Sequence, residues 1–136
     1  MGRTYRAKTL TISINRPVAE VYAFATKVEN LPRWATSFVR SIRKTAEGWV
    51  ADTSEGAMGF EFAAKNEFGV LDQIVRPAPG IEILVPIRIV PNGDGAEVIF
   101  TLIQFPGMSD EKFSRDSGTV ERDLKTLKTV LERDAR

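Results

Sequence analysis

The order of strand and helix patterns in the sequence predicts an α+β fold, in which a curved antiparallel sheet of about seven strands wraps around a long C-terminal helix. Three observations support this prediction. Strand-type alternation near the N-terminus is followed by two short helical patterns. Strand-length segments separated by turn residues then occupy residues 37–105, and one long amphipathic helical pattern follows them. The length of 136 residues suits a single domain, 1–136.

The first strand is predicted from about Lys8 to Asn15, where apolar and hydroxyl-bearing residues alternate. Asn15 offers a helix cap and Pro17 suits a first helical turn, so we predict a helix of roughly ten residues after them. The segment Asn30-Leu31-Pro32 is expected to end this helix, because a proline disfavours helical geometry in the residue before it. A short second helical turn is predicted at Arg33-Trp34-Ala35.

Turn residues divide the central stretch into strands. The predicted turns lie at Glu47-Gly48, Gly56 to Gly59, Phe68-Gly69, Pro77 to Gly80 and Asn92 to Gly95. The last of these contains both Asn-Gly and Asp-Gly, which are the dipeptides most typical of tight hairpins. We therefore expect antiparallel strands joined by short loops.

The C-terminal pattern predicts a long amphipathic helix. Ser109 is a plausible cap, and the two acidic residues after it suit the positive end of a helix dipole. The apolar stripe consists of Phe113, Val120, Leu124, Leu127 and Leu131. Gly118 interrupts this stripe and predicts a kink or a close approach of another segment.

Composition excludes several kinds of chemistry. The chain has no cysteine and no histidine, which excludes disulfides, thiolate nucleophiles, common zinc sites and a histidine base. We expect no cofactor and no metal site. The net charge is +1, so no overall field attracts nucleic acid or anionic lipid.

The sequence also carries no sign of export or membrane insertion. The basic segment from Met1 to Lys8 lacks the apolar core of a signal peptide, and no apolar run approaches the length of about 18 residues that a membrane span needs. A soluble, cytoplasmic protein is therefore expected.

Three segments together resemble the START/Bet v 1-like (SRPBCC) superfamily. They are the run from Ile12 to Tyr22, the run from Asn30 to Trp34, and the helical run from Asp123 to Lys128. Within that superfamily, the chain is most similar to small bacterial proteins described as polyketide cyclase/dehydrase-like. The resemblance implies the helix-grip fold, with a pocket between the curved sheet and the C-terminal helix. It also implies that Trp34 lies in a lid over the mouth of that pocket.

The resemblance leaves the function open, because the superfamily includes lipid carriers, hormone receptors, cyclases, dehydratases and co-chaperones. The side chains of the predicted strands therefore have to indicate which of these functions fits the chain. Strand parity is informative here, because residues two apart share a face of the sheet.

The hairpin predicted from Phe60 to Arg76 separates charged from neutral side chains. A two-residue loop at Phe68-Gly69 pairs residues whose numbers sum to 137 and sets Lys65 opposite Asp72 on the solvent face. Asp72 is then a surface ion-pair partner, not a general base. The inner face carries Phe62, Ala64, Asn66, Leu71, Gln73 and Val75.

The hairpin predicted from Ile81 to Phe105 also has an inner face without ionisable side chains. Its inner face carries Ile83, Val85, Ile87, Ile89, Val98, Phe100, Leu102 and Gln104. Arg88 is expected to be exposed, near Glu97. The outer face also carries Leu84, Val90, Ile99, Ile103 and Phe105, which suggests a homodimer through this sheet face. A β-bulge that exchanges the two faces is the alternative.

The hairpin around Glu47-Gly48 has two mixed faces. A two-residue loop sets Arg43 opposite Asp52 and Arg40 opposite Glu55. The sequence leaves open which pair points inward. A buried pair would orient a polar substrate or supply an acid, and an exposed cross-strand ion pair is the alternative.

These patterns favour a protein that binds a small hydrophobic or lipid-like ligand in an internal cavity, with neutral amides as hydrogen-bond groups. The candidate ligand-binding residues, each also explicable as core packing, are Trp34, Met58, Phe60, Phe62, Asn66, Gln73, Phe100, Gln104, Met108 and Phe113. One alternative is a polyketide cyclase or dehydratase acting on an aromatic substrate, with Arg43, Asp52 or Asp72 as acid or base. Another is a co-chaperone-like module that uses the outer sheet face.

Overall fold

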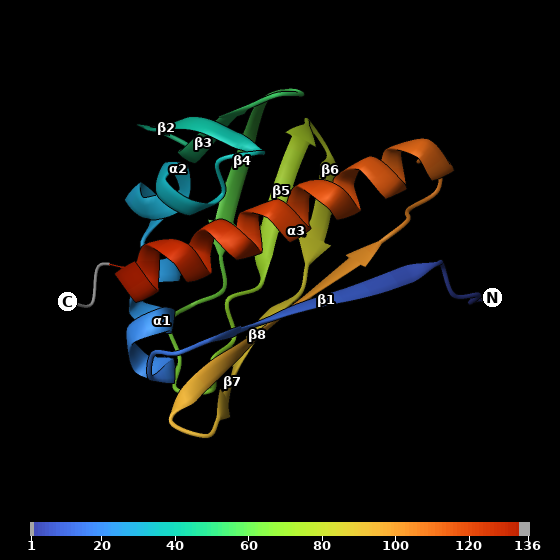
Figure 1. The fold of residues 1–136 in the computed structure, drawn as a ribbon. Helices are drawn as coiled ribbons and strands as arrows, with labels where there is room; N and C mark the ends of the chain where they lie inside the picture. The colour runs from blue at the N-terminus through green and yellow to red at the C-terminus, as the bar shows by residue number, and fades with distance from the viewer. Residues whose placement is uncertain (1, 134–136) are drawn as a thin grey trace.

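The computed structural model describes residues 2–133, whose arrangement is shown in Figure 1. The elements follow in the order β1 (Ala7–Ile14), α1 (Val18–Ala25), the 3₁₀ helix η1 (Val28–Asn30), α2 (Leu31–Trp34), β2 (Val39–Thr45), β3 (Gly48–Thr53), β4 (Gly56–Phe62), β5 (Gln73–Ala78), β6 (Ile81–Val85), β7 (Ile87–Asn92), β8 (Gly95–Ile103) and α3 (Asp110–Arg133). The strands are antiparallel, and α3 runs across one side of the curved sheet (Figure 1). The predicted α+β fold is confirmed.

The strands form a three-stranded sheet, β1-β8-β7, and a five-stranded sheet, β2-β3-β4-β5-β6. The two sheets meet at Pro86, between the end of β6 and the start of β7. Proline has no N–H for a ladder bond, so the strand changes partner there. The carbonyl of Pro86 still accepts a hydrogen bond from the N–H of Thr101 at 3.1 Å.

This change of partner corrects the hairpin predicted from Ile81 to Phe105. Of β6 and β7, which both lie in this stretch, β7 pairs with β8, and its register places a two-residue turn at Gly93 and Asp94. β6 pairs with β5 instead. The predicted faces survive, because Ile87 and Ile89 are buried while Arg88 and Val90 are exposed.

The β4–β5 connection also differs from the prediction. Phe60 faces Val75 and Phe62 faces Gln73, so paired numbers sum to 135 and not to 137. The shift is by two residues, and each side chain therefore keeps its predicted face. The cause is the length of the connection, because residues 63–72 form a loop where the two-residue turn was expected. We call this segment the β4–β5 loop.

Two further turns are displaced. In the β2–β3 hairpin Thr45 faces Gly48, so the turn lies at Ala46 and Glu47, one residue earlier than predicted. In the β3–β4 hairpin Thr53 faces Gly56, so β4 begins at the glycine where a turn was predicted. Each glycine is the first residue after its turn and adopts a positive φ, 120° at Gly48 and 106° at Gly56, which glycine tolerates better than other residues.

The helices differ from prediction mainly at their starts. Pro17 is the residue before α1, and no side chain caps that helix. The expected cap Asn15 instead donates its backbone N–H to the carboxylate of Glu132 at 2.8 Å. α1 already ends at Ala25, and Pro32 lies in the first turn of α2, where a missing N–H costs nothing.

The C-terminal helix agrees with its prediction. The Ser109 hydroxyl accepts the backbone N–H of Lys112 at 3.0 Å, as expected for a cap. Gly118 lies inside the single helix α3, and the nearest atom to a Cβ placed there is Nη1 of Arg122 at 3.6 Å, an ordinary contact. The predicted close approach at Gly118 is therefore wrong.

The hydrophobic core lies mainly between α3, α1 and the three-stranded sheet. The larger side chains that these elements bury in it include Ile14, Val21, Ile87, Ile89, Val98, Leu124 and Leu127. The five-stranded sheet contributes Val39, Ala51 and Phe60 to the same cluster. Apolar side chains of β5 and β6 are less completely buried, and this difference defines the candidate site.

Candidate functional site

The inner face of the five-stranded sheet is apolar over most of its width. One cross-strand row consists of Trp49, Phe60, Val75 and Ile83, and the next consists of Phe62, Gln73 and Val85. The first row ends at the β2 edge with Lys44, whose ammonium lies 5.6 Å from the centre of the Trp49 ring. The part of the face built by β4, β5 and β6 therefore presents no ionisable group.

Several inward-facing apolar residues are only half-buried, and Phe62, Val85 and Phe100 among them pack against the core cluster that includes Leu124 of α3. They are Phe62, Val75, Ile83, Val85, Phe100 and Leu102. A tightly filled interior covers such side chains almost completely. The five-stranded sheet thus keeps accessible apolar surface on the side that carries Phe60.

Three neutral polar groups in the interior have no hydrogen-bond partner within residues 2–133. The side-chain amide of Gln73 points from β5, and the hydroxyl of Ser117, a residue only 5% exposed, points from α3. The buried indole N–H of Trp34 also has no acceptor. Among the described residues, the Trp34 nitrogen is the one fully buried side-chain polar atom without a partner, at a cost of about 1–3 kcal/mol, whereas Gln73 is half-buried.

Two of the predicted ligand amides have other roles. The Asn66 amide oxygen accepts the backbone N–H groups of Phe68 and Val70 at 2.9 and 3.2 Å, and its nitrogen donates to carbonyls of the same loop. The Gln104 amide nitrogen donates to the Met108 carbonyl at 2.9 Å and to Asp110 at 2.8 Å. Both amides shape backbone turns, and Gln73 remains the amide on the inner face.

The remaining predicted ligand residues lie in three places. Met58 and Phe60 are buried on the inner face of β4, and Phe62 and Phe100 are half-buried. Trp34 is buried in α2, and its predicted place in a lid over the mouth of the pocket stays a prediction. Met108 precedes α3, and Phe113 is buried in its first turns, where the guanidinium of Arg6 lies 4.8 Å from the ring centre.

Asp72 is a structural carboxylate. Arg88 donates two hydrogen bonds to it, at 2.9 and 3.1 Å, and the backbone N–H of Ile87 donates a third at 2.8 Å. The hydrogen bond from Arg88 is the main cause that holds the pKa of Asp72 below its usual value. Asp72 therefore pairs with Arg88 and not with Lys65, and Arg88 does not pair with Glu97 as expected. A carboxylate stabilised in this way is a weak base.

Of the two charged pairs expected in the β2–β3 hairpin, one forms and is exposed, and the other does not form. Arg43 faces Val50, and its guanidinium lies 3.5 Å from Asp52 with both side chains accessible to solvent. Glu55 pairs with Lys112 of α3 at 3.1 Å, so the expected pair with Arg40 is wrong. Among the described residues of this hairpin, neither expected pair forms a buried acid–base group.

The sequence reasoning missed Asp123, a buried carboxyl on α3. It accepts the backbone N–H of Ser37 at 2.8 Å and so ties α3 to the turn after α2. Burial raises the pKa of Asp123. A signal was present, because Asp123 follows Val120 by three residues and precedes Leu127 by four, in phase with the apolar stripe.

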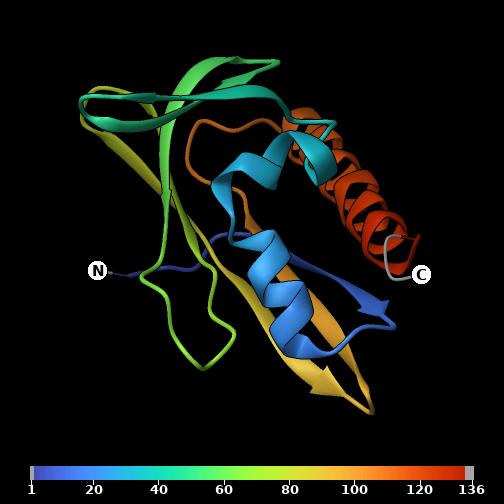
Figure 2. The same ribbon diagram turned by 90° about the vertical axis from the view of Figure 1, so that its left-hand side faces the viewer.

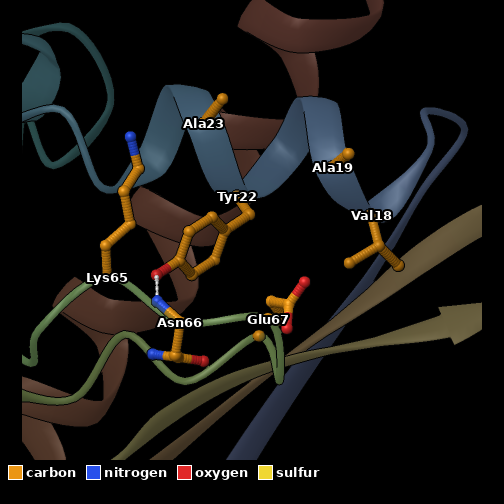
Figure 3. Close-up of a pocket in the computed structure, with 8 residues that line it drawn as sticks. Val18, Ala19, Tyr22, Ala23, Lys65, Asn66 and Glu67 are labelled. Carbon is orange, nitrogen blue, oxygen red and sulfur yellow. Dashed lines mark hydrogen bonds between the residues drawn. The ribbon is translucent and has the colours of Figure 1, made fainter.

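Two open grooves lie elsewhere on the surface. One, of about 690 Å³, lies between α1 and the β4–β5 loop, which descends beside α1 in Figure 2 and is enlarged in Figure 3. The other, of about 570 Å³, follows the row Arg43, Val50, Gly59 and Arg76 on the outer face of the five-stranded sheet. Neither groove is the pocket predicted between sheet and α3.

Within residues 2–133, no three acidic side chains are close enough to hold a metal ion together. The same residues contain no helix with the length and apolar character needed to cross a membrane.

The structure is similar to solved structures at low sequence identity. A START superfamily protein from Mycobacterium smegmatis superimposes with a TM-score of 0.68 at 13% identity, over 93% of this chain and 97% of that chain. Ara h 8.0201, a Bet v 1 allergen, gives a TM-score of 0.70 at 11% identity, over 94% and 98% of the two chains. DynU16, from the dynemicin biosynthetic locus, superimposes with a TM-score of 0.69 at 16% identity, over 93% of this chain and 47% of that chain.

No family model matches the sequence, and no curated protein matches it. The structural similarity nevertheless covers nearly the whole chain. The protein therefore has the helix-grip fold of the START and Bet v 1-like (SRPBCC) proteins, as its sequence predicted.

Proposed function

We propose that the protein binds a small hydrophobic or lipid-like molecule between the five-stranded sheet and α3. The observation that carries the proposal is the inner face of β5 and β6, whose apolar side chains face the interior and stay half-buried. A ligand that covers this surface gains about 25 cal/mol for each Å² removed from water. Affinity then comes mainly from apolar burial, which needs no charge on the ligand.

The unpaired polar groups give the ligand its expected polarity. The Gln73 amide both donates and accepts, the Ser117 hydroxyl does the same, and the Trp34 indole only donates. A ligand with one or two neutral oxygen atoms satisfies these groups, whereas a bare hydrocarbon leaves them unpaired. Selectivity for a neutral, oxygen-bearing hydrophobe follows from this difference.

The carboxylates give less support to an enzymatic function. A cyclase or dehydratase without histidine needs an acid or base in contact with the substrate. Asp72 is held by Arg88, and Asp52 is exposed beside Arg43. The buried carboxyl of Asp123 is occupied by Ser37.

A matched pair of variants on β6 tests the binding proposal. Ile83 points inward and Leu84, the next residue, points outward and is 52% exposed. We expect Ile83→Trp to weaken binding of the neutral dye Nile red about tenfold, because the indole fills the space the dye needs. Leu84→Trp adds the same group outside and should leave binding unchanged.

Native mass spectrometry of the purified protein should also reveal a co-purified ligand, and Gln73→Leu should shift its preference toward less polar molecules. Asp72→Asn should leave dye binding unchanged. If Ile83→Trp and Leu84→Trp bind the dye equally well, the site does not lie on the inner face. Loss of turnover of a cyclisation substrate in Asp72→Asn would instead support the enzyme.

A further inference from the structure

Phe68, at the tip of the β4–β5 loop, is the most exposed large hydrophobic residue in the described part of the chain. Its side chain is 81% exposed, whereas the next, Leu84, is 52% exposed. A phenylalanine covers about 150–250 Å² when it is buried, so leaving one in water forgoes a large favourable term. A single exposed apolar residue is common on a protein surface, so the surroundings of Phe68 decide whether a partner covers it.

The loop holds Phe68 in a fixed position. The Asn66 amide makes four hydrogen bonds within the loop, including one from the backbone N–H of Phe68 at 2.9 Å. The Gly69 carbonyl accepts the N–H of Ile89 in β7 at 2.8 Å, and the Tyr22 hydroxyl of α1 accepts the N–H of Asn66 at 3.1 Å. An aromatic side chain on an anchored loop is prepared for binding, because little entropy remains to be lost.

A groove of about 690 Å³ lies beside the loop that carries Phe68, although Phe68 itself does not line it. Residues on both sides of Phe68 line it, together with α1, as Figure 3 shows. Its lining consists of Val18, Ala19, Tyr22, Ala23, Lys65, Asn66, Glu67 and Gly69. The α1 side of the groove is largely apolar, and the Tyr22 ring reaches across the groove so that its hydroxyl meets the backbone of Asn66 (Figure 3).

The charges around the groove are self-complementary. Lys65 and Glu67 stand at the loop side of the groove with opposite charges (Figure 3), and neither has an ion-pair partner within residues 2–133. In a two-fold dimer the same patch meets itself, so a lysine on one copy meets a glutamate on the other twice. A patch that carries an exposed ring, a groove and both charges can therefore pair with a copy of itself.

We propose that a second copy of this chain docks here, with Phe68 of each copy in the groove of the other. Lys65 then faces Glu67 of the second copy across the two-fold axis. The contact is built by α1 and the β4–β5 loop and leaves the inner face of β5 and β6 untouched. This surface differs from the outer sheet face, which the apolar residues of β6 and β7 had suggested.

Sedimentation equilibrium from micromolar to millimolar concentration tests the proposal. The wild-type mass should rise toward that of a dimer, and Phe68→Ser should raise the dissociation constant about tenfold or more. Leu84→Ser is the matched control on the outer sheet face and should leave the dissociation constant unchanged. Both residues are exposed, so each variant should fold, as an unchanged circular dichroism spectrum would verify.

A charge exchange tests the two-fold geometry. Lys65→Glu alone and Glu67→Lys alone should each weaken the dimer several-fold, because each places like charges face to face twice. The double variant restores opposite charges and should recover the wild-type dissociation constant. An equimolar mixture of the two single variants should form a mixed dimer more tightly than either variant pairs with itself.

Three results would overturn the proposal. The first is a wild-type protein that stays monomeric at millimolar concentration. The second is a dimer that Leu84→Ser disrupts and Phe68→Ser does not, which would place the contact on the outer sheet face. The third is a double charge variant that is no better than its single parents, which would exclude the two-fold pairing.

Discussion

The close contact at Gly69 leads to a sharp prediction about stability. A Cβ at this position would lie 2.1 Å from the carbonyl oxygen of Ile89, and the backbone has φ +72°. Gly69→Ala therefore meets two costs. A left-handed conformation costs a non-glycine residue about 1–2 kcal/mol, and an overpacked contact costs about 1–3 kcal/mol more. We expect a total loss of about 2–5 kcal/mol in the free energy of unfolding.

Two other glycines separate these costs. Gly93 has φ +60° with open space around its Cβ position, so Gly93→Ala should show the conformational cost alone. At Gly95 the φ is ordinary, but a Cβ would lie 2.5 Å from the Ile14 carbonyl oxygen, so Gly95→Ala should show the contact cost alone. Urea unfolding of the three variants, followed by circular dichroism, measures each loss. If Gly69→Ala is no more destabilised than Gly93→Ala, the loop is not packed against β7 as described.

Three further predictions concern the buried polar groups. Burial raises the pKa of Asp123, so its stabilising contribution is present below the unfolded-state value and is lost as the pH rises through the folded-state pKa. Asp123→Asn keeps an acceptor for Ser37 and should be more stable than wild type at pH 7, with the difference shrinking toward pH 3 in urea titrations. Asp72 has the opposite sign, because the hydrogen bond from Arg88 lowers its pKa. Asp72→Asn should lose about 1–2 kcal/mol at pH 7 and progressively less as the pH falls through the folded-state pKa. Trp34→Phe removes the unpaired indole N–H but also leaves a cavity at a buried side chain, so thermal unfolding should show a loss smaller than the about 3–5 kcal/mol of a Trp→Ala substitution in a core.

Local patterns were sufficient for much of the fold. The alternation in β1, the hydroxyl cap at Ser109 and the apolar stripe of α3 each depend on neighbouring residues in sequence. The faces of β4, β5 and β7 were also correct, although one register was displaced. A shift by an even number of residues cannot move a side chain from one face to the other.

Long-range packing decided what these patterns missed. Nothing near Pro86 in sequence specifies that the strand before it pairs with β5 and the strand after it with β8. The Asn66 amide was predicted to face a ligand because its parity suited the inner face. Its hydrogen bonds go instead to the backbone of the β4–β5 loop, whose shape depends on the contact of Gly69 with β7.

By itself, the sequence determined the α+β class, the positions of most strands and helices, and a neutral inner surface on β4 to β6. These features follow from periodicity and from turn and cap preferences, which act over a few residues. Only the tertiary structure decided which polar groups stay unpaired, that Asp72 binds Arg88, and that Phe68 stands beside a groove. These features depend on segments far apart in the chain, whose contacts form only when the sheet has curved around α3.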